Sequence, residues 1–215
     1  AYLPRYAPMA ARFASLLNLR DRIPGLARLS ESMLGFSARR PLPQWRRDVF
    51  QGSANNPEEP DVVLLADTFN TYFEPENLRA AEAVLRAAGF AVHVANAGVG
   101  ERPLCCGRTF LAAGLIDEAR AEAQRLMTAL APFVEQGIPI VGLEPSCLLT
   151  LRDELTAMLP GPQSQALAGQ AQLFEEFLAG ESAAGRLNLS LAPLPGRRAL
   201  LHGHCHQKAF DVMGD

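Results

Sequence analysis

The run Val62-Val63-Leu64-Leu65-Ala66 decides the fold of this chain. Five consecutive apolar residues without polar alternation are typical of a β-strand that is buried on both faces, as in a parallel sheet. Pro75 then opens a helical pattern that lasts to residue 88 and ends at Gly89. A strand followed by a helix is the repeating unit of an α/β fold.

The same alternation continues towards the C-terminus. Further strands are expected at residues 90–94, 138–143 and 198–202. Further helices are expected at residues 117–130, 147–158 and 165–178. This order predicts an α/β fold with a mostly parallel sheet and flanking helices.

Residues 1–60 have a different character, because prolines and arginines interrupt any long pattern. We expect short helices at residues 9–18 and 26–34, and an irregular or helical N-terminal arm that packs on the rest of a larger parent enzyme. A flexible linker is the alternative. The stretch Asn55-Asn56-Pro57-Glu58-Glu59-Pro60 marks the boundary to the folded unit at residues 61–215.

The composition excludes several classes of protein. The chain has 215 residues, of which 48% are hydrophobic, and a net charge of −3 without a basic stripe, so no nucleic-acid partner is expected. No apolar run approaches the ~20 residues of a membrane-spanning helix. Four unevenly spaced cysteines do not resemble a disulfide framework, which predicts a cytoplasmic protein. Because the chain begins without Met and ends soon after its last cysteine, we expect a fragment that is truncated at its C-terminus.

The four cysteines lie in three polar motifs. Two are adjacent, in Cys105-Cys106-Gly107, and the others stand in Glu144-Pro145-Ser146-Cys147 and His202-Gly203-His204-Cys205-His206. Each motif follows a predicted strand, and sites in open α/β sheets form beyond the carboxyl ends of the strands. We therefore expect the thiols to converge on one rim of the sheet.

Thiolate and imidazole groups suit an iron–sulfur cluster, zinc or ferrous iron. Cys147 also begins a predicted helix, and a helix N-terminus favours the thiolate form. Less specific roles remain open: a lone buried cysteine is usually a small apolar residue. Glu144 would then only cap the following helix, and the segment Asp67-Thr68-Phe69-Asn70 would only shape a loop.

Together the motifs resemble the cysteine-rich CCG domain. The resemblance rests on Leu104-Cys105-Cys106-Gly107-Arg108, on Glu144-Pro145-Ser146-Cys147 and on the His-Cys-His motif with Gln207-Lys208-Ala209. It covers nearly the whole chain, residues 35–43 of the arm included. This domain occurs in heterodisulfide reductase, in the iron–sulfur subunits of glycolate oxidase and anaerobic glycerol-3-phosphate dehydrogenase, and at the C-terminus of FAD-linked oxidases. The FAD-linked oxidases, such as D-lactate and D-2-hydroxyglutarate dehydrogenases, are the most similar group.

The resemblance implies an electron-transfer domain of an FAD-linked 2-hydroxy-acid dehydrogenase, which passes electrons from flavin to a quinone or another acceptor. FAD would lie outside this chain, which alone would be inactive. The implied partners are flavin and ferredoxin-like domains of the same polypeptide, with membrane association only through the acceptor. The implied cofactor here is an iron–sulfur cluster or a single iron or zinc ion. Its candidate ligands are Cys105, Cys106, Cys147 and Cys205, with His204 and Glu144 as nitrogen and oxygen donors.

The chain departs from the fuller CCG pattern in two places. Residues 67–71 hold no cysteine, and Cys147 lacks a second thiol, since Thr150 stands three residues after it. A complete cubane normally needs four cysteines. Cys205 or a histidine completing the set, a mononuclear metal, and an empty fragment all stay open. A thiol-based catalytic site at Cys147 or Cys106 and a non-catalytic interaction domain are the competing functions.

Overall fold

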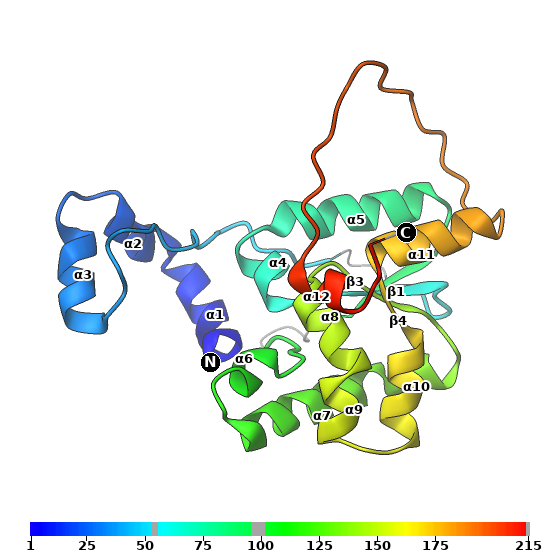
Figure 1. Cartoon of the computed structure of the whole chain (residues 1–215), viewed down its shortest axis with the longest axis horizontal. Helices are drawn as coiled ribbons and strands as arrows, with labels where there is room; N and C mark the ends of the chain where they lie inside the picture. The colour runs from blue at the N-terminus through cyan, green and yellow to red at the C-terminus, as the bar shows by residue number, and fades with distance from the viewer. Residues whose placement is uncertain (53–55, 96–101, 214–215) are drawn as a thin grey trace.

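The structure is a computed structural model, and it describes residues 1–52, 56–95 and 102–213. Its centre is a parallel sheet with the strand order β2-β1-β3-β4 (Figure 1). The register pairs Val62 with Val92 and Val63 with Ile140. The strands are β1 (Val62–Leu65), β2 (Val92–Ala95), β3 (Ile140–Gly142) and β4 (Ala171–Leu173). The predicted α/β class with a parallel sheet is therefore confirmed.

Helices cover both faces of this sheet. On one face lie α5 (Pro75–Ala87) and α11 (Phe174–Ala183), and on the other lie α7 to α10 (Figure 1). The helices of that second face are α7 (Ile116–Glu135), α8 (Pro145–Arg152), α9 (Glu154–Met158) and α10 (Pro162–Gln170). The short helices of this part of the chain are α4 (Thr68–Tyr72), α6 (Arg108–Leu111) and α12 (Cys205–Ala209).

Strand β1 supplies side chains to both apolar layers. Val62 and Leu64 pack with α5 and α11, whereas Val63 and Leu65 pack with the helices of the opposite face. All four residues are buried. Burying one Leu or Val side chain stabilises a fold by about 1.5–3 kcal/mol, so both faces reward the apolar run. This accounts for the absence of polar alternation in β1.

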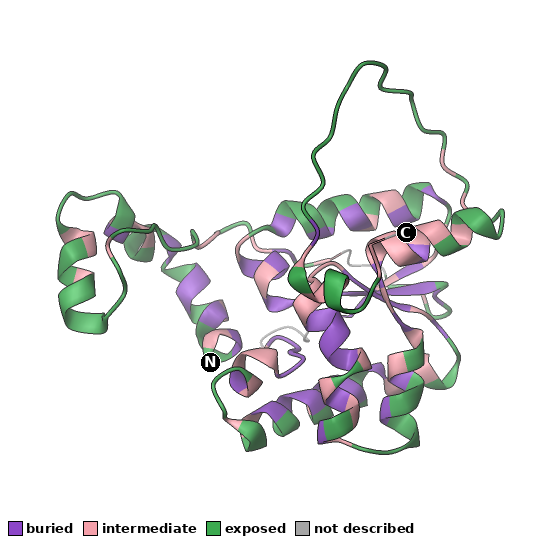
Figure 2. Cartoon of the chain, viewed as in Figure 1, coloured by how far each residue is buried: buried purple, intermediate pink, exposed green. Residues whose placement is uncertain are grey.

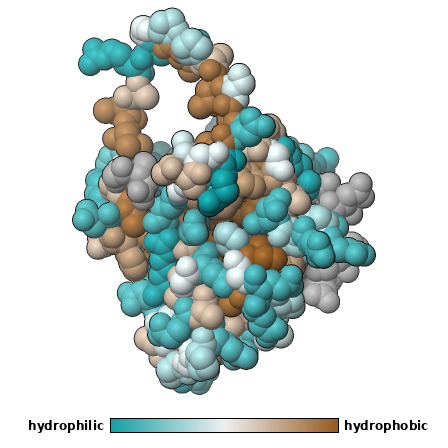
Figure 3. All heavy atoms as spheres, turned by 90° about the vertical axis from the view of Figure 1, so that its right-hand side faces the viewer, coloured by the Kyte–Doolittle hydropathy of each residue, from teal (hydrophilic) through white to brown (hydrophobic). Residues whose placement is uncertain are grey.

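The strand predicted at residues 198–202 is wrong. This segment belongs to a long loop between α11 and α12 that stands away from the body, with apolar side chains along it (Figure 3). Leu200 is 99% exposed. A strand needs hydrogen bonds to a neighbour, and this segment has none among the described residues. An apolar run alone does not form one.

The helix predicted at residues 165–178 is interrupted by β4, which takes the fourth place in the sheet. Arg152 holds β4 in an extended form: its Nε donates to the carbonyl of Ala171 at 2.7 Å, and its guanidinium pairs with Glu176. Glu176 in turn accepts a hydrogen bond from the amide of Leu173 at 2.7 Å. The contacts of Arg152 come from α8, so the local pattern does not contain them, whereas the Leu173–Glu176 bond belongs to the start of α11.

The N-terminal arm is helical, as predicted, and its first helix lies against the body. The helix expected at residues 26–34 is α3 (Leu26–Leu34), while α1 (Leu3–Arg12), α2 (Ala14–Leu17) and the 3-10 helix η1 (Asn18–Asp21) replace the one expected at 9–18. In α1, Ala7 and Ala11 pack against Tyr72. By contrast, α2 and α3 project from the body and are largely exposed (Figure 2). The domain boundary stays a prediction, and residues 53–55 of that region lie outside the described part.

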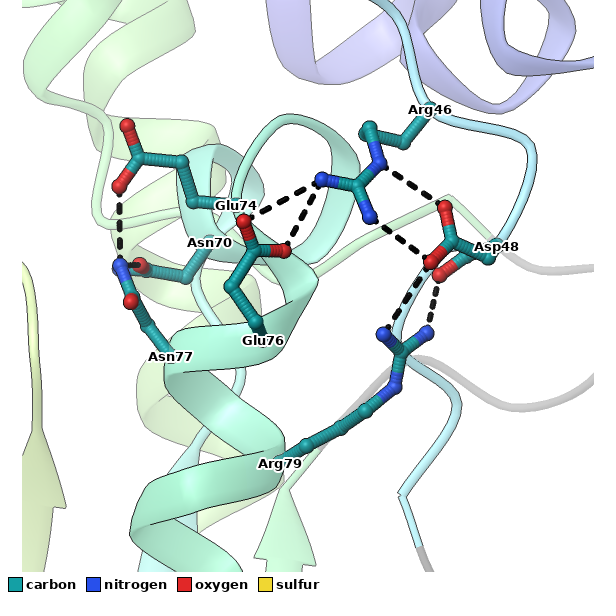
Figure 4. A network of polar contacts seen from close by, with 7 residues as sticks. All are labelled: Arg46, Asp48, Asn70, Glu74, Glu76, Asn77 and Arg79. Atoms are coloured by element: carbon teal, nitrogen blue, oxygen red, sulfur yellow. Dashed lines mark hydrogen bonds and ion pairs between the residues drawn. The ribbon is translucent and has the colours of Figure 1, made fainter.

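A polar network fastens the C-terminal part of the arm to α5 (Figure 4). Arg46 pairs with Asp48 at 2.9 Å and with Glu76 at 3.0 Å, and Arg79 of α5 also pairs with Asp48. These side chains are substantially exposed, and such ion pairs contribute little to stability. Their geometry nevertheless fixes where the arm joins the body.

The network predicts an unusual titration of Asp48. Its hydrogen bonds with Arg46 hold the pKa of Asp48 at about 2, below the ordinary 3.8. Because the pKa is depressed, the network contributes fully above pH 3.8 and is lost as the pH falls through 2. Carboxyl ¹³C shifts measure this titration. We expect Arg46→Ala to raise the pKa of Asp48 towards 3.8 and Arg120→Ala, on the far helix α7, to leave it unchanged. A pKa near 3.8 in the unaltered protein contradicts the network.

Candidate metal centre

The strand order creates a crevice between β1 and β3. The chain leaves β1 for β2 on one side and later returns to β3 on the other, so the connections diverge at this point. Ligands of doubly wound sheets bind at such a switch point, beyond the carboxyl ends of the strands. The residues after β1 and β3 meet here, together with the Cys-Cys-Gly motif from the connection that follows β2.

A small cavity of about 20 Å³ lies at this place. That volume matches roughly one water molecule or one ion. Pro4 of α1 forms part of its wall, so the arm helps to close it. Its polar and sulfur-bearing lining residues are Asp67, Thr68, Cys105, Cys106, Thr109 and Cys147. Three of the four predicted thiol ligands are thus brought together.

Gly107 shapes the backbone that presents the adjacent cysteines. Its φ is +87°, a left-handed conformation, and it precedes α6. A Cβ atom at this position would lie 2.6 Å from the carbonyl oxygen of Ala119. Its amide donates to Sγ of Cys105 at 3.4 Å. Glycine is therefore required both for the turn and for the close approach of α7.

A buried ion-pair cluster supports the same loop from behind. Glu122 of α7 is fully buried and pairs with Arg5 of the arm, with Arg102 and with Arg125. Arg125 also donates to the carbonyl of Arg102 at 2.9 Å and to that of Pro103. The cluster therefore fixes the chain just before Cys105 and ties α1 to it.

The three thiols are neighbours in the cavity wall, in the order Cys105, Cys106 and Cys147, and each influences the pKa of the next. The Cys106 thiol beside it, and then burial, raise the pKa of Cys105. Cys105 lowers the pKa of Cys106, but Cys147 and burial raise it, with a net rise. For Cys147 the neighbouring Cys106 lowers the pKa, yet burial and the charge of Asp67 outweigh this effect. Burial and negative neighbours thus outweigh any lowering of the Cys147 pKa by the start of α8, and a cation in the cavity would favour the thiolates.

Asp67 is a site residue whose role the sequence did not reveal. It caps α4, as a loop-shaping residue would: Oδ1 accepts from the amides of Phe69 and Asn70, both at 2.9 Å. However, it also lines the cavity and is only 5% exposed. Burial raises its pKa, although these hydrogen bonds lower it, and the nearby charge of Glu144 adds to the rise. Its place directly after the buried strand was the one available signal.

The other predicted ligands lie on the rim, outside the residues that line the cavity. Glu144 is the N-cap of α8, and its Oε1 accepts from Oγ of Ser146 at 2.5 Å. Cys205 is exposed at the start of α12, with its Sγ 3.9 Å from Nδ1 of His204. His206 comes closer to the site, because its Nε2 lies 3.1 Å from the guanidinium of Arg108.

The side chains that line the cavity are of the type that binds a soft metal, but they are not arranged around a common point. Across the described residues, no group of three or more His, Cys, Asp or Glu side chains is positioned to hold a metal ion. Three thiols around one cavity nevertheless match iron–sulfur or zinc chemistry. In addition, Oγ1 of Thr109 is buried without a hydrogen-bond partner. A buried hydroxyl without a partner calls for an explanation, and a bound water or ion in the cavity is one.

Two curated proteins are similar to this chain. The chain is 26% identical over 205 residues to a subunit of the anaerobic glycerol-3-phosphate dehydrogenase of Escherichia coli K12, and equally to the same subunit from strain O157:H7. The match covers 91% of this chain and 49% of each relative, so the chain spans about half the length of the curated relatives it matches. No family model and no solved structure matches. The similarity connects the chain with a subunit of an oxidoreductase.

The described helices include none that is both long and apolar enough to cross a membrane.

Gly107 gives a direct test of how the cysteine loop is built. We expect Gly107→Ala to lower the free energy of unfolding by more than the ~1–2 kcal/mol that a left-handed non-glycine residue costs, because its Cβ meets Ala119. Gly114→Ala is the matched control, since Gly114 has a φ of +74° with no atom within 4 Å of its Cβ. Urea unfolding measures both. Equal losses in the two variants would show that the close approach does not matter.

Proposed function

We propose that this chain is a metal-binding electron-transfer domain of an oxidoreductase. The observation that carries the proposal is the row of three buried thiols, Cys105, Cys106 and Cys147, at the switch-point cavity. When bound, an iron–sulfur cluster or a single iron ion supplies one-electron redox chemistry, whereas zinc would make the site structural. The similarity to a dehydrogenase subunit supports the redox reading.

The chain itself contributes three things to such a centre. The thiols provide soft ligands, and Gly107 presents two of them from one turn. The apolar wall, including Leu65, Leu104 and Leu126, excludes water from the cavity. The arm closes one side through Pro4. Burial of this kind influences the reduction potential of a metal centre.

We further propose that the parent enzyme is an FAD-linked 2-hydroxy-acid dehydrogenase. The motifs resemble those of FAD-linked 2-hydroxy-acid dehydrogenases, so the electrons would come from a flavin domain, pass a ferredoxin-like domain and reach a quinone or another acceptor. The protein would be cytoplasmic and would associate with the membrane through that acceptor. The name of the matched relatives supports a dehydrogenase partner in general. The thiol-catalysis alternative is less favoured, because the pKa of each of the three clustered thiols is raised, with burial as a cause in every case.

The arm is proposed to dock this domain on its partner. Residues 1–47 hold nine arginines and two acidic residues, whereas residues 48–215 hold eleven basic and 21 acidic residues. Helix α3 has no buried residue, and Met33 and Leu34 are 73% and 68% exposed. A basic and apolar projection is complementary to an acidic surface with an apolar groove, and we assign that surface to the flavin-bearing partner.

Serine variants of the cysteines test the metal site. After anaerobic reconstitution with ferrous iron and sulfide, or with zinc alone, we expect Cys105→Ser, Cys106→Ser and Cys147→Ser each to lose most of the bound metal. The reason is that a ligand set of three thiols tolerates no loss. Mass-spectrometric metal analysis of each protein gives the readout.

Cys205→Ser is the matched control, because Cys205 is exposed and does not line the cavity. We expect it to retain the metal, and circular dichroism confirms that every variant is folded. An unaltered protein that binds neither iron nor zinc, with all four thiols free, would overturn the proposal.

The docking role of the arm predicts a second loss of function. We expect Met33→Asp combined with Leu34→Asp to weaken binding to the flavin domain of the parent enzyme at least about tenfold, because charges replace apolar anchors. Leu191→Asp changes an equally exposed leucine outside the arm and should have no effect. Titration calorimetry at low and high salt measures the affinity. Unchanged affinity in the arm variant, or insensitivity to salt, would count against docking through this surface.

A further inference from the structure

We propose that Asp67 is a ligand of the metal centre and supplies an oxygen donor beside the three thiols. The inference deepens the proposed function and rests on it. It concerns a residue that follows β1, whereas the cysteines come from the connections after β2 and β3. All three segments that meet at the switch point would then contribute to one site.

The carboxylate of Asp67 is buried without a positively charged partner among the described residues. Asp67 is 5% exposed, and no ion pair among the described residues includes it. Its hydrogen bonds come only from neutral groups: the amides of Phe69 and Asn70 and the side-chain amide of Asn70. A buried carboxylate is normally paired with a cation or coordinates a metal, because burying an isolated charge is costly. A cation in the adjacent cavity would remove this cost.

In the same molecule, the negative charge of the buried Glu122 is neutralised by arginines. That carboxylate is fully buried too, but three arginines surround it. The fold therefore provides positive charge where a buried carboxylate serves structure. It provides none to Asp67, whose neighbours in the cavity wall are thiols that themselves become anionic when they bind metal.

Two oxygen atoms in the cavity wall have room for a further partner. Oδ1 of Asp67 already accepts two amide bonds, whereas Oδ2 accepts only the side-chain amide of Asn70, at 2.7 Å. A carboxylate oxygen has room for a further partner. The unsatisfied Oγ1 of Thr109 lines the same cavity. One bound group would satisfy both residues.

The Asn70 contact orients the carboxylate in the way expected of a ligand. Carboxylates that hold metals are themselves hydrogen-bonded, which fixes their direction. Asn70 in turn accepts from Nδ2 of Asn77 on α5 at 3.0 Å (Figure 4). With the bond from Asn70 to Oδ2 of Asp67, a row of two amides therefore leads from α5 to Asp67. The same row joins the site to the helix that anchors the arm segment.

The test compares Asp67→Asn, Asp67→Cys and Asp117→Asn in the 215-residue chain. Asparagine keeps the shape and the helix cap but loses the charge, and cysteine offers a thiol instead. Asp117→Asn removes an exposed carboxylate in the first turn of α7, which does not line the cavity. Each protein is loaded anaerobically with ferrous iron and sulfide or with cobalt(II) as a spectroscopic probe, and bound metal, absorption and paramagnetic resonance are recorded.

We expect Asp67→Asn to weaken metal binding at least about tenfold, Asp67→Cys to retain the metal with stronger sulfur-to-metal absorption, and Asp117→Asn to match the unaltered protein. Unchanged affinity and spectra in both Asp67 variants, while Cys106→Ser loses the metal, would overturn the role of Asp67 and leave the metal site standing. No metal in the unaltered protein would overturn both.

Discussion

Burial of β1 on both faces is the constraint on which the rest of the structure depends. Because β1 lies between β2 and β3 and supplies side chains to both apolar layers, the chain must leave it in one direction and return on the other side. The crevice that results lies at the carboxyl ends of the strands. Asp67, the Cys-Cys-Gly loop and Cys147 occupy it as a consequence of topology, although 80 residues of sequence separate the first from the last.

The buried charges of the body fall into two groups: the ion pairs around Glu122, which hold the cysteine loop, and the acidic groups that line the cavity. Behind the cysteine loop, arginines neutralise Glu122 and fix the backbone before Cys105. Inside the cavity, groups that can become negative have no positive neighbour among the described ion pairs. A protein interior tolerates such a set when a cation or protons compensate it. The arm participates in both regions, since Arg5 pairs with Glu122 and Pro4 lines the cavity.

The sequence predicted those elements whose structure depends on residues that are near one another in the chain. The apolar run at β1 and the stop at Gly89, whose φ is +94°, were visible in the sequence, and so was the convergence of Cys105, Cys106 and Cys147. The shorter apolar run Ala199-Leu200-Leu201 did not form the expected strand, because no strand pairs with it among the described residues. Strand β4 was missed because Arg152 holds it from α8, which is distant in the sequence. The burial of Asp67 likewise depends on packing that no sequence pattern contains.

The central claim is that the buried thiols act together on one metal. X-ray absorption spectroscopy of the anaerobically loaded chain tests it most directly, because metal–sulfur and metal–oxygen shells differ in length, with Zn–S near about 2.3 Å and Zn–O at roughly 2.0–2.2 Å. The account predicts a shell of three sulfur atoms with one lighter donor in the zinc-loaded protein. A shell of nitrogen and oxygen donors alone would contradict it.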